Sequence, residues 1–283
     1  QRSVAMGRTV VGRCVKRISR WLNARQRFLL ATERGLLTRP SPPYVAAVSQ
    51  YVKRQVQRAY GTPPERVRVV FNGVAIEPLA NDDAKAERTE LRGRYGCSAE
   101  ARVVLFVAHN FKLKGLAELI RATAGEGGAR PGWTCWVAGR DNATPYRRLA
   151  TSLGVERDVA FLGADVPMGL LYAAADVLAH PTFYDPCSRV VLESLCCGLP
   201  VVTTRHNGAA EVMRAGVHGE VVDSPRAIDA LRRAIENCLS PAVRDACRSD
   251  AAAMRTRLSM SRHAGELMEL YEQVLSSKRG AAS

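Results

Sequence analysis

Asp185-Pro-Cys-Ser-Arg-Val-Val-Leu-Glu193 is the most informative stretch of this chain, and it closes at Gly198-Leu-Pro200. Asp185 followed by Pro186 predicts the start of a helix, because aspartate is a good N-cap acceptor and proline fits the first helical position. Gly198 and Pro200 predict the end of that helix and the turn into a strand over 201–203. We therefore expect a short helix that leads directly into a strand.

Polar groups at two positions of this predicted helix indicate a binding role. At the helix start, backbone N–H groups would point outward as an anion or hydroxyl site, and they belong to Cys187, Ser188 and Arg189. Glu193 lies two turns deeper among apolar residues, where a carboxylate needs donors such as sugar hydroxyls. The alternative is that Asp185 is only an N-cap and that Glu193 only pairs with Arg189 one turn earlier.

The composition is that of a globular protein. With 283 residues and 47% hydrophobic content, the chain can form one large domain or two smaller ones with a sizeable core. The eight cysteines form no Cys-x-x-Cys pair and have no histidine cluster beside them, so we expect reduced thiols and no zinc site. Because no apolar run has membrane-spanning length and no signal peptide is visible, we expect a cytoplasmic location.

Positive charge is concentrated at the beginning of the chain. Residues 1–60 hold thirteen lysines or arginines and one acid, Glu33, which leaves only +2 of the net charge of +14 for the rest. This imbalance indicates an anionic partner for the first segment alone, either nucleic acid or an anionic membrane or glycolipid surface. No helix-turn-helix, zinc-finger or aromatic-basic pattern accompanies the charge, so nucleic acid is not expected. A solvated basic face is the alternative.

Short apolar runs alternate with helical patterns through most of the chain, which predicts an α/β fold with a parallel, doubly wound sheet. Ligands of such sheets bind at the carboxyl ends of the strands. The residues that follow strands therefore share one edge: Lys114, Gly139, Gly163 and Asp185. The strands are expected over 44–48, 67–71, 103–108, 134–138, 159–162, 177–180, 200–203 and 220–222. The helices are expected over 1–37, 50–60, about 114–124, 146–153, 168–174, the Asp185 segment, 209–214, 225–257 and a last helix capped by Ser261.

The spacing of the two acids resembles the signature of retaining nucleotide-sugar glycosyltransferases of family 4, which have the GT-B fold. That signature is Glu, seven residues, Glu and then Gly-x-Pro, and here Asp185 takes the first position and Glu193 the second. The resemblance implies that Glu193 holds the ribose hydroxyls of a nucleotide and that Asp185 faces the donor sugar. It also implies a complete Rossmann-like C-terminal domain over 79–258, the remainder of an acceptor-side N-terminal domain over 1–78, and a helix over 259–283 that crosses back to it.

A second family motif precedes the glycine of His109-Asn-Phe-Lys-Leu-Lys-Gly115. Lys114 matches a family lysine that contacts the donor diphosphate, whereas the family's arginine is absent and His109 stands near its place. Lys112 could supply the missing charge, and we include Asn110 among the donor-binding candidates. The alternative is that both lysines are solvated residues at a helix start.

Weaker candidates complete the predicted site. Gly208, in a glycine turn that ends at Glu211, would let the backbone approach the donor closely. Arg140 and Gly163 are candidates for contacts to phosphate and base, while His180 is expected to be a packing residue beside the site. Cys187 and Ser188 replace the aromatic residue and glycine that are usual in the family, as in relatives of the lipopolysaccharide core glucosyltransferases.

The resemblance implies transfer of a hexose from a nucleotide-diphosphate sugar, with a UDP-sugar expected, to a saccharide or glycolipid acceptor with retention. It implies no metal ion or other cofactor. It also favours an anionic membrane surface as the partner of residues 1–60, at the inner face of the cell membrane. The family's acceptor site and pocket histidine belong to the N-terminal region, so we expect this chain alone to bind donor and to transfer poorly. The alternatives are a non-catalytic relic that binds donor, and a nucleotide-sugar epimerase on the same fold.

Overall fold

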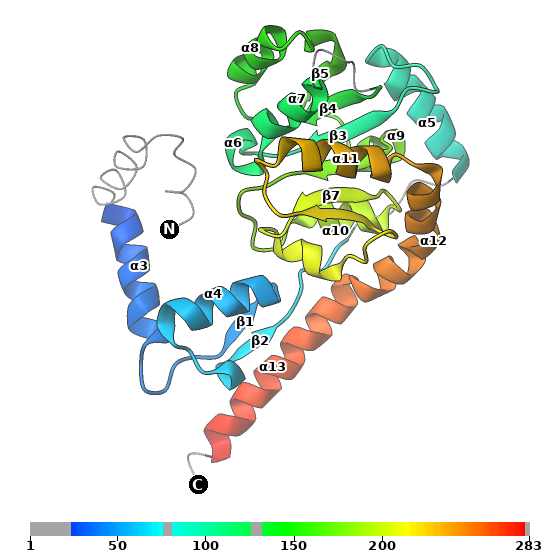
Figure 1. Cartoon of the computed structure of the whole chain (residues 1–283). Helices are drawn as coiled ribbons and strands as arrows, with labels where there is room; N and C mark the ends of the chain where they lie inside the picture. The colour runs from blue at the N-terminus through cyan, green and yellow to red at the C-terminus, as the bar shows by residue number, and fades with distance from the viewer. Residues whose placement is uncertain (1–23, 76–80, 126–131, 281–283) are drawn as a thin grey trace. The chain divides into compact units, whose positions relative to one another are not determined.

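The computed structural model describes residues 24–75, 81–125 and 132–280. They form two compact units (Figure 1). One unit contains the residues up to Asn72 together with those from His263 onward, and the other runs from Gly73 to Arg262.

The larger unit is built on a parallel sheet of six strands in the order β5-β4-β3-β6-β7-β8. The strands are β3 (Val103–Val107), β4 (Thr134–Ala138), β5 (Val159–Gly163), β6 (Val177–His180), β7 (Val201–Thr204) and β8 (Gly219–Val222). Counted along the chain, this order is that of the doubly wound nucleotide-binding fold, in which the order reverses between the first and fourth strands, here β3 and β6. The predicted parallel α/β sheet is confirmed.

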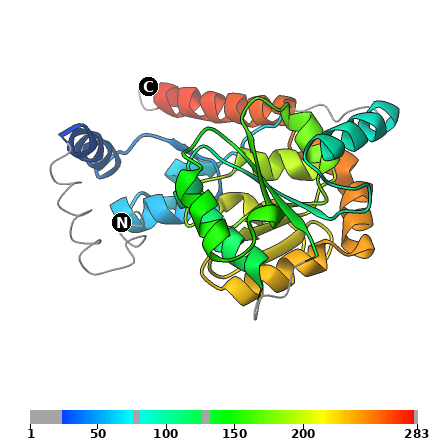
Figure 2. The same ribbon diagram turned by 90° about the horizontal axis from the view of Figure 1, so that it is seen from above.

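Helices cover both faces of this sheet (Figure 2). On one face α7 packs against α8 and α11, while on the other α10 packs against α12 and α9 against α5. Because both faces are covered, the central strand β3 is apolar along its whole length, and four of its five residues are fully buried. The helices are α5 (Asn81–Arg94), α6 (Phe111–Lys114), α7 (Leu116–Ala124), α8 (Thr144–Ser152), α9 (Met168–Ala174), α10 (Arg189–Cys196), α11 (Ile228–Cys238) and α12 (Pro241–Arg257), with short 3-10 turns η2 (Glu156–Asp158) and η3 (Gly208–Val212).

The smaller unit pairs two short parallel strands beside helices. Its elements are α3 (Ala24–Leu37), β1 (Val45–Ala47), α4 (Gln50–Tyr60), the 3-10 turn η1 (Pro64–Arg66), β2 (Val67–Val69) and most of α13 (Met260–Gly280). Ser49 caps α4, since its hydroxyl accepts a hydrogen bond from the N–H of Val52 at 3.2 Å. Within this unit His263 of α13 donates from Nδ1 to the carbonyl of Phe71 at 2.8 Å.

Three helix predictions need correction. The predicted helix over 114–124 is divided by Gly115, which has φ of +83° and separates α6 from α7. The predicted helical stretch over 225–257 is likewise two helices, α11 and α12, separated at Leu239 and Ser240. Ser261 lies inside α13, and Ser259 is the residue whose hydroxyl accepts from the N–H of Arg262, at 3.1 Å. Of the helix expected over 1–37, residues 1–23 lie outside the described residues, and α3 carries exposed apolar side chains: Phe28, Leu29 and Leu30.

The helix of the opening motif starts later than predicted. It begins at Arg189, with Ser188 at the N-cap position, and Asp185 lies in the preceding loop. The reason is a long-range contact, because Asp185 donates its N–H to the carbonyl of His206 and accepts at its own carbonyl from Gly208. This bridge holds residue 185 in an extended pairing that a helix start would not allow.

Candidate functional site

Two loops meet at the carboxyl edge of the sheet, where the strand order reverses between β3 and β6. The N–H of Phe183, after β6, donates to the carbonyl of Leu113, after β3, at 2.9 Å. Gly115 permits this approach, because a Cβ on it would lie 2.1 Å from the carbonyl oxygen of Pro181. The two predicted motifs are therefore adjacent, at the position where sheets of this order bind ligands.

Lys114 and Asp185 form an ion pair at this junction. Lys114 Nζ lies 2.5 Å from Asp185 Oδ2, and the two side chains are 18% and 10% exposed. Burial acts to raise the pKa of Asp185, but the contact with His180 and the positive charge of Lys114 outweigh it and hold that pKa below its usual range. Asp185 is therefore ionised at neutral pH, and the lysine paired with it is partly exposed.

His180 stands behind this pair at the end of β6. Its Nε2 lies 3.4 Å from Asp185 Oδ2 and 3.4 Å from the hydroxyl of Ser188, and its ring stacks on Phe106. Burial lowers the pKa of His180, so the imidazole is neutral at pH 7. The residue packs in the core, as predicted, and in addition it contacts two of the predicted site residues.

The loop before α10 uses most of the N–H groups that were predicted to bind an anion. The N–H of Cys187 donates to Asp185 Oδ1 at 3.2 Å, and the N–H of Ser188 donates to Asn207 Oδ1 at 3.2 Å. The prediction that these two N–H groups point outward is wrong, because Asp185 and Asn207 already satisfy them. The N–H of Gly208 likewise donates to the carbonyl of Asp185, at 3.0 Å.

Asn207 is a structural residue that sequence reasoning passed over in favour of Gly208. Its amide donates to Thr203 Oγ1 at 3.0 Å, while its oxygen accepts from Ser188 and from Ala209. It therefore fixes the loop before α10 against the turn after β7. The signal that could have found it is its position between a strand end and a glycine, where asparagine typically bonds to nearby backbone.

Glu193 lies in the second turn of α10 with its side chain 15% exposed. Its Oε2 accepts from the hydroxyl of Tyr172 at 2.9 Å, and its Oε1 lies 3.5 Å from the guanidinium of Arg189, which is 67% exposed. The pairing with Arg189 that was held as the alternative is present, although it is long. Tyr172 was not predicted, because nothing local in the sequence joins it to an acid 21 residues away.

The remaining predicted residues lie in the segment 109–115, called the lysine loop, or at the ends of β4 and β5. Asn110 caps α6, since its side chain accepts from the N–H of Leu113 at 2.9 Å. Asp141, another residue that was not predicted, accepts from the N–H of Phe111 at 2.7 Å and so ties the loop after β4 to the lysine loop. The other candidates on these loops are all exposed: His109, Lys112, Arg140 and Gly163.

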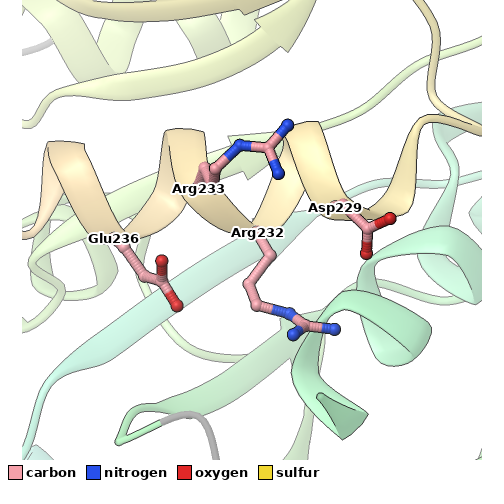
Figure 3. A pocket seen from close by; sticks show the side chains of 4 residues that line it. All are labelled: Asp229, Arg232, Arg233 and Glu236. Atoms are coloured by element: carbon pink, nitrogen blue, oxygen red, sulfur yellow. The ribbon is translucent and has the colours of Figure 1, made fainter. Parts of the chain in front are cut away.

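A separate hollow of the surface lies along α11 and is lined by Asp229, Arg232, Arg233 and Glu236 (Figure 3). It contains none of the predicted site residues. Its two acids and two arginines balance in charge, and Arg232 already donates to the carbonyl of Ala122 at 3.3 Å. This lining offers no excess positive charge for an anionic ligand, so the carboxyl edge of the sheet is the better candidate site.

Neither a metal-binding cluster nor a membrane-spanning helix is present within residues 24–75, 81–125 and 132–280. No group of three or more histidine, cysteine or acidic side chains is placed there to hold a metal ion. None of the helices described is both long enough and apolar enough to cross a membrane.

Comparison with known families gives two matches along the chain. Residues 87–253 match the family model of glycosyl transferases group 1, and residues 10–78 match that of glycosyltransferase family 4. The first match contains the candidate site described above.

Individual relatives agree with these matches. The chain is 27% identical over 220 residues to lipopolysaccharide glucosyltransferase WaaG of Escherichia coli K12, covering 77% of this chain and 59% of the relative. It is 30% identical over 247 residues to a D-inositol 3-phosphate glycosyltransferase of Corynebacterium glutamicum, covering 83% and 58%. The chain thus spans somewhat more than half the length of these curated relatives.

Solved structures show the same similarity in three dimensions. The crystal structure of WaaG aligns with a TM-score of 0.71 at 27% identity, over 83% of this chain and 65% of that one. Anabaena Alr3699/HepE in complex with UDP-glucose aligns with a TM-score of 0.74 at 25% identity, over 87% and 68%.

Proposed function

The chain belongs to the glycosyl transferases group 1 family, and on that premise we propose that it serves in moving a hexose from a nucleotide-diphosphate sugar to a saccharide or glycolipid acceptor, with retention of configuration. The observation that carries the proposal is the pairing of Lys114 with Asp185 at the point where the strand order reverses. A lysine there, paired with an acid that a ligand can displace, suits a diphosphate, which carries negative charge of its own.

The donor is proposed to be a UDP-sugar. HepE, which this chain resembles in fold, has been solved with UDP-glucose, and WaaG is named a glucosyltransferase. Glu193 is proposed to hold the ribose hydroxyls and Asp185 to face the hexose. Both carboxylates are largely buried and have little access to water, so sugar hydroxyls that reach them can supply the hydrogen bonds that water would otherwise make.

Rate acceleration would come from positioning and from the charge of Lys114. As the bond between sugar and diphosphate breaks, negative charge grows on the departing phosphate oxygens. A lysine already fixed at the end of α6 stabilises that charge without moving far. Because Lys114 supplies the positive charge at this point, we propose transfer that needs no metal ion or other cofactor.

The acceptor is proposed to lie at an anionic membrane surface on the cytoplasmic side. In the smaller unit, α3 has no buried residue, and it exposes Phe28, Leu29, Leu30 and Leu36 beside arginines of the same helix. Exposed apolar side chains flanked by arginine are the features that bind anionic lipid. Flotation with vesicles that contain phosphatidylglycerol should recover the protein, whereas phosphatidylcholine vesicles should not, and recovery should fall as salt rises.

Calorimetric titration with UDP tests the donor site. We expect binding by the chain, and we expect Glu193→Ala to weaken it by about 1–3 kcal/mol, because polar groups of the ribose lose a partner. Glu236→Ala is the matched control, since it removes an exposed acid from another helix of the same unit and should leave affinity unchanged. Absence of UDP binding by the unmodified chain would overturn the proposal. Epimerised free sugar in a donor incubation would point to the epimerase alternative.

A further inference from the structure

Tyr172 is a buried polar group to which the proposed transfer chemistry assigns no role. It lies in α9 and is 3% exposed. Its hydroxyl donates to Glu193 Oε2 at 2.9 Å, and the carbonyl of Val190 lies 3.4 Å away. A tyrosine hydroxyl needs a partner when it is buried. Here the nearer partner is the carboxylate that the proposed function assigns to ribose.

We propose that Tyr172 is a positioning residue that holds one oxygen of Glu193 so that the other can bind the ribose hydroxyls of the donor. This inference rests on the proposed function and goes further by naming what makes the site select ribose. Tyr172 occupies Oε2 with a short bond, whereas Oε1 has only a 3.5 Å contact to a guanidinium that is 67% exposed. A long, exposed ion pair contributes little and is exchanged easily, so Oε1 is the oxygen that a ligand can reach.

The chemistry of the Tyr172–Glu193 pair supports a phenol that is a constant hydrogen-bond donor to the carboxylate. Burial, followed by the charge of Glu193, raises the pKa of Tyr172 above the ordinary range of tyrosine, so the phenol keeps its proton. A protonated phenol that faces a carboxylate forms a charge-assisted bond, which is stronger than one between neutral groups. Glutamate otherwise loses considerable side-chain entropy when it is immobilised. A carboxylate fixed before the nucleotide arrives avoids that loss at the binding step.

Tyr172 is itself held in place by a rigid part of the unit. Two arginines of α5 bind the carbonyl groups at the end of α9: Arg88 donates to Ala173 at 2.7 Å, and Arg92 donates to Ala174 at 3.0 Å. Leu171 and Ala174, on either side of Tyr172 in α9, are buried in the core. The phenol therefore projects from a helix with little freedom to shift, which is what a positioning residue requires.

The test compares two nucleotides on Tyr172→Phe. Calorimetry would give dissociation constants for UDP and for 2′,3′-dideoxyuridine diphosphate, which lacks the hydroxyls assigned to Glu193. We expect Tyr172→Phe to weaken UDP binding by about five- to tenfold and to leave the dideoxy nucleotide unchanged, so that the preference for ribose shrinks. Tyr95→Phe is the matched control, since Tyr95 packs against Trp136 and should keep the preference of the unmodified chain.

A double variant guards against a purely structural effect. In a Glu193→Ala background, Tyr172→Phe should cause no further loss of UDP affinity, because the carboxylate through which it acts is gone. Unmodified protein that prefers UDP, together with a Tyr172→Phe variant that keeps the same preference, would overturn this inference and leave the proposed function standing. Equal binding of both nucleotides by the unmodified chain would instead overturn the ribose role of Glu193, and this inference with it.

Discussion

Two aspartates lie on either side of β6 and have different surroundings: Asp176 at the edge of the sheet called structural below, and Asp185 at the edge that carries the candidate site, called the functional edge. Asp176, just before the strand, accepts hydrogen bonds from three arginines and from the N–H of Val103, all at 2.7 or 2.8 Å; the arginines are Arg88, Arg92 and Arg244. Asp185, five residues after the strand, has one lysine at 2.5 Å, with His180 and a backbone N–H at longer range. A carboxylate that accepts several short hydrogen bonds (called saturated below) fixes the fold. A carboxylate with one short contact to a cation can give up that contact when a ligand binds.

The pKa values of the two carboxyls are shifted in the same direction, but by different groups. Burial acts to raise the pKa of both carboxyls. At Asp176 the N–H of Val103 and then the charges of Arg92 and Arg88 outweigh it, whereas at Asp185 His180 and Lys114 do so. Both pKa values end below the usual range. Each acid therefore contributes stability that is present above the unfolded-state pKa of about 4 and is lost as pH falls through the lower folded value.

The largest expected effect comes from removing the saturated carboxylate. Asp176→Ala leaves three arginines without their acid, two of them already bound to carbonyl groups that they cannot leave. We expect the free energy of unfolding to fall by about 3–5 kcal/mol, measured by urea denaturation. Asp223→Ala is the control, because its pair with Arg205 joins side chains that are 87% and 65% exposed, and it should change stability by less than about 0.5 kcal/mol. Equal, small effects for both variants would remove the distinction between a structural and an exchangeable acid.

The next effect sharpens the comparison by testing what holds the functional edge together. Gly115→Ala would place a Cβ 2.1 Å from the carbonyl oxygen of Pro181, at a residue whose φ is +83°. We expect a loss of about 2–5 kcal/mol in unfolding free energy, from the unfavourable backbone conformation together with the overlap. Gly163→Ala is the matched control, because φ is +77° there and nothing lies within 4 Å, so it should cost only about 1–2 kcal/mol. Similar losses for both glycines would show that close packing of the two loops contributes nothing.

A smaller expected effect is a pH dependence of stability that arises at the functional edge and not at the structural one. His180 is buried and neutral beside Asp185, with its pKa lowered chiefly by burial. As pH falls below about 6.5, the unfolded chain takes up a proton that folded His180 does not accept, so stability falls by up to about 1.4 kcal/mol per pH unit until the folded pKa is reached. His180→Gln should flatten this part of the curve, while Asp176→Asn should leave its slope unchanged. The measurement is urea denaturation at several pH values between 7 and 5, and an unchanged slope in His180→Gln would contradict the expectation.

The functional edge was more predictable from the sequence than the structural one. Buried strands such as β4 and β6 were located because an apolar run of four or five residues between two helical patterns is typical of a strand covered on both faces. Lys114 and Asp185 were brought together by topology alone, since each follows a strand and the carboxyl ends of parallel strands share an edge. The ion pair between them confirms that they are neighbours, whereas their roles toward a donor stay predictions.

Long-range contacts explain what the sequence did not disclose. Arg92 and Arg244 lie 84 and 68 residues from Asp176, and no local pattern marks any of the three as partners. The same cause moved the start of α10, because the backbone of Asp185 pairs with residues more than twenty positions later, an interaction that N-cap rules do not consider. Local rules therefore worked where neighbours in sequence decide the structure, and they failed where a polar group is satisfied across the fold.

The smallest expected effect tests whether the acid of the functional edge is exchangeable. Asp185→Asn keeps the shape of the side chain and frees Lys114 from its ion pair, so we expect UDP to bind more tightly by about 1 kcal/mol, or roughly fivefold in Kd. Stability should fall much less than in Asp176→Ala, because a lysine that is 18% exposed can recover water as a partner. Calorimetry with UDP and urea denaturation give both quantities on one sample. If Asp185 competes with the UDP phosphates for Lys114, its replacement by asparagine can only make the lysine more available. Weaker UDP binding would therefore mean that Asp185 organises the site for the nucleotide and does not compete with its phosphates.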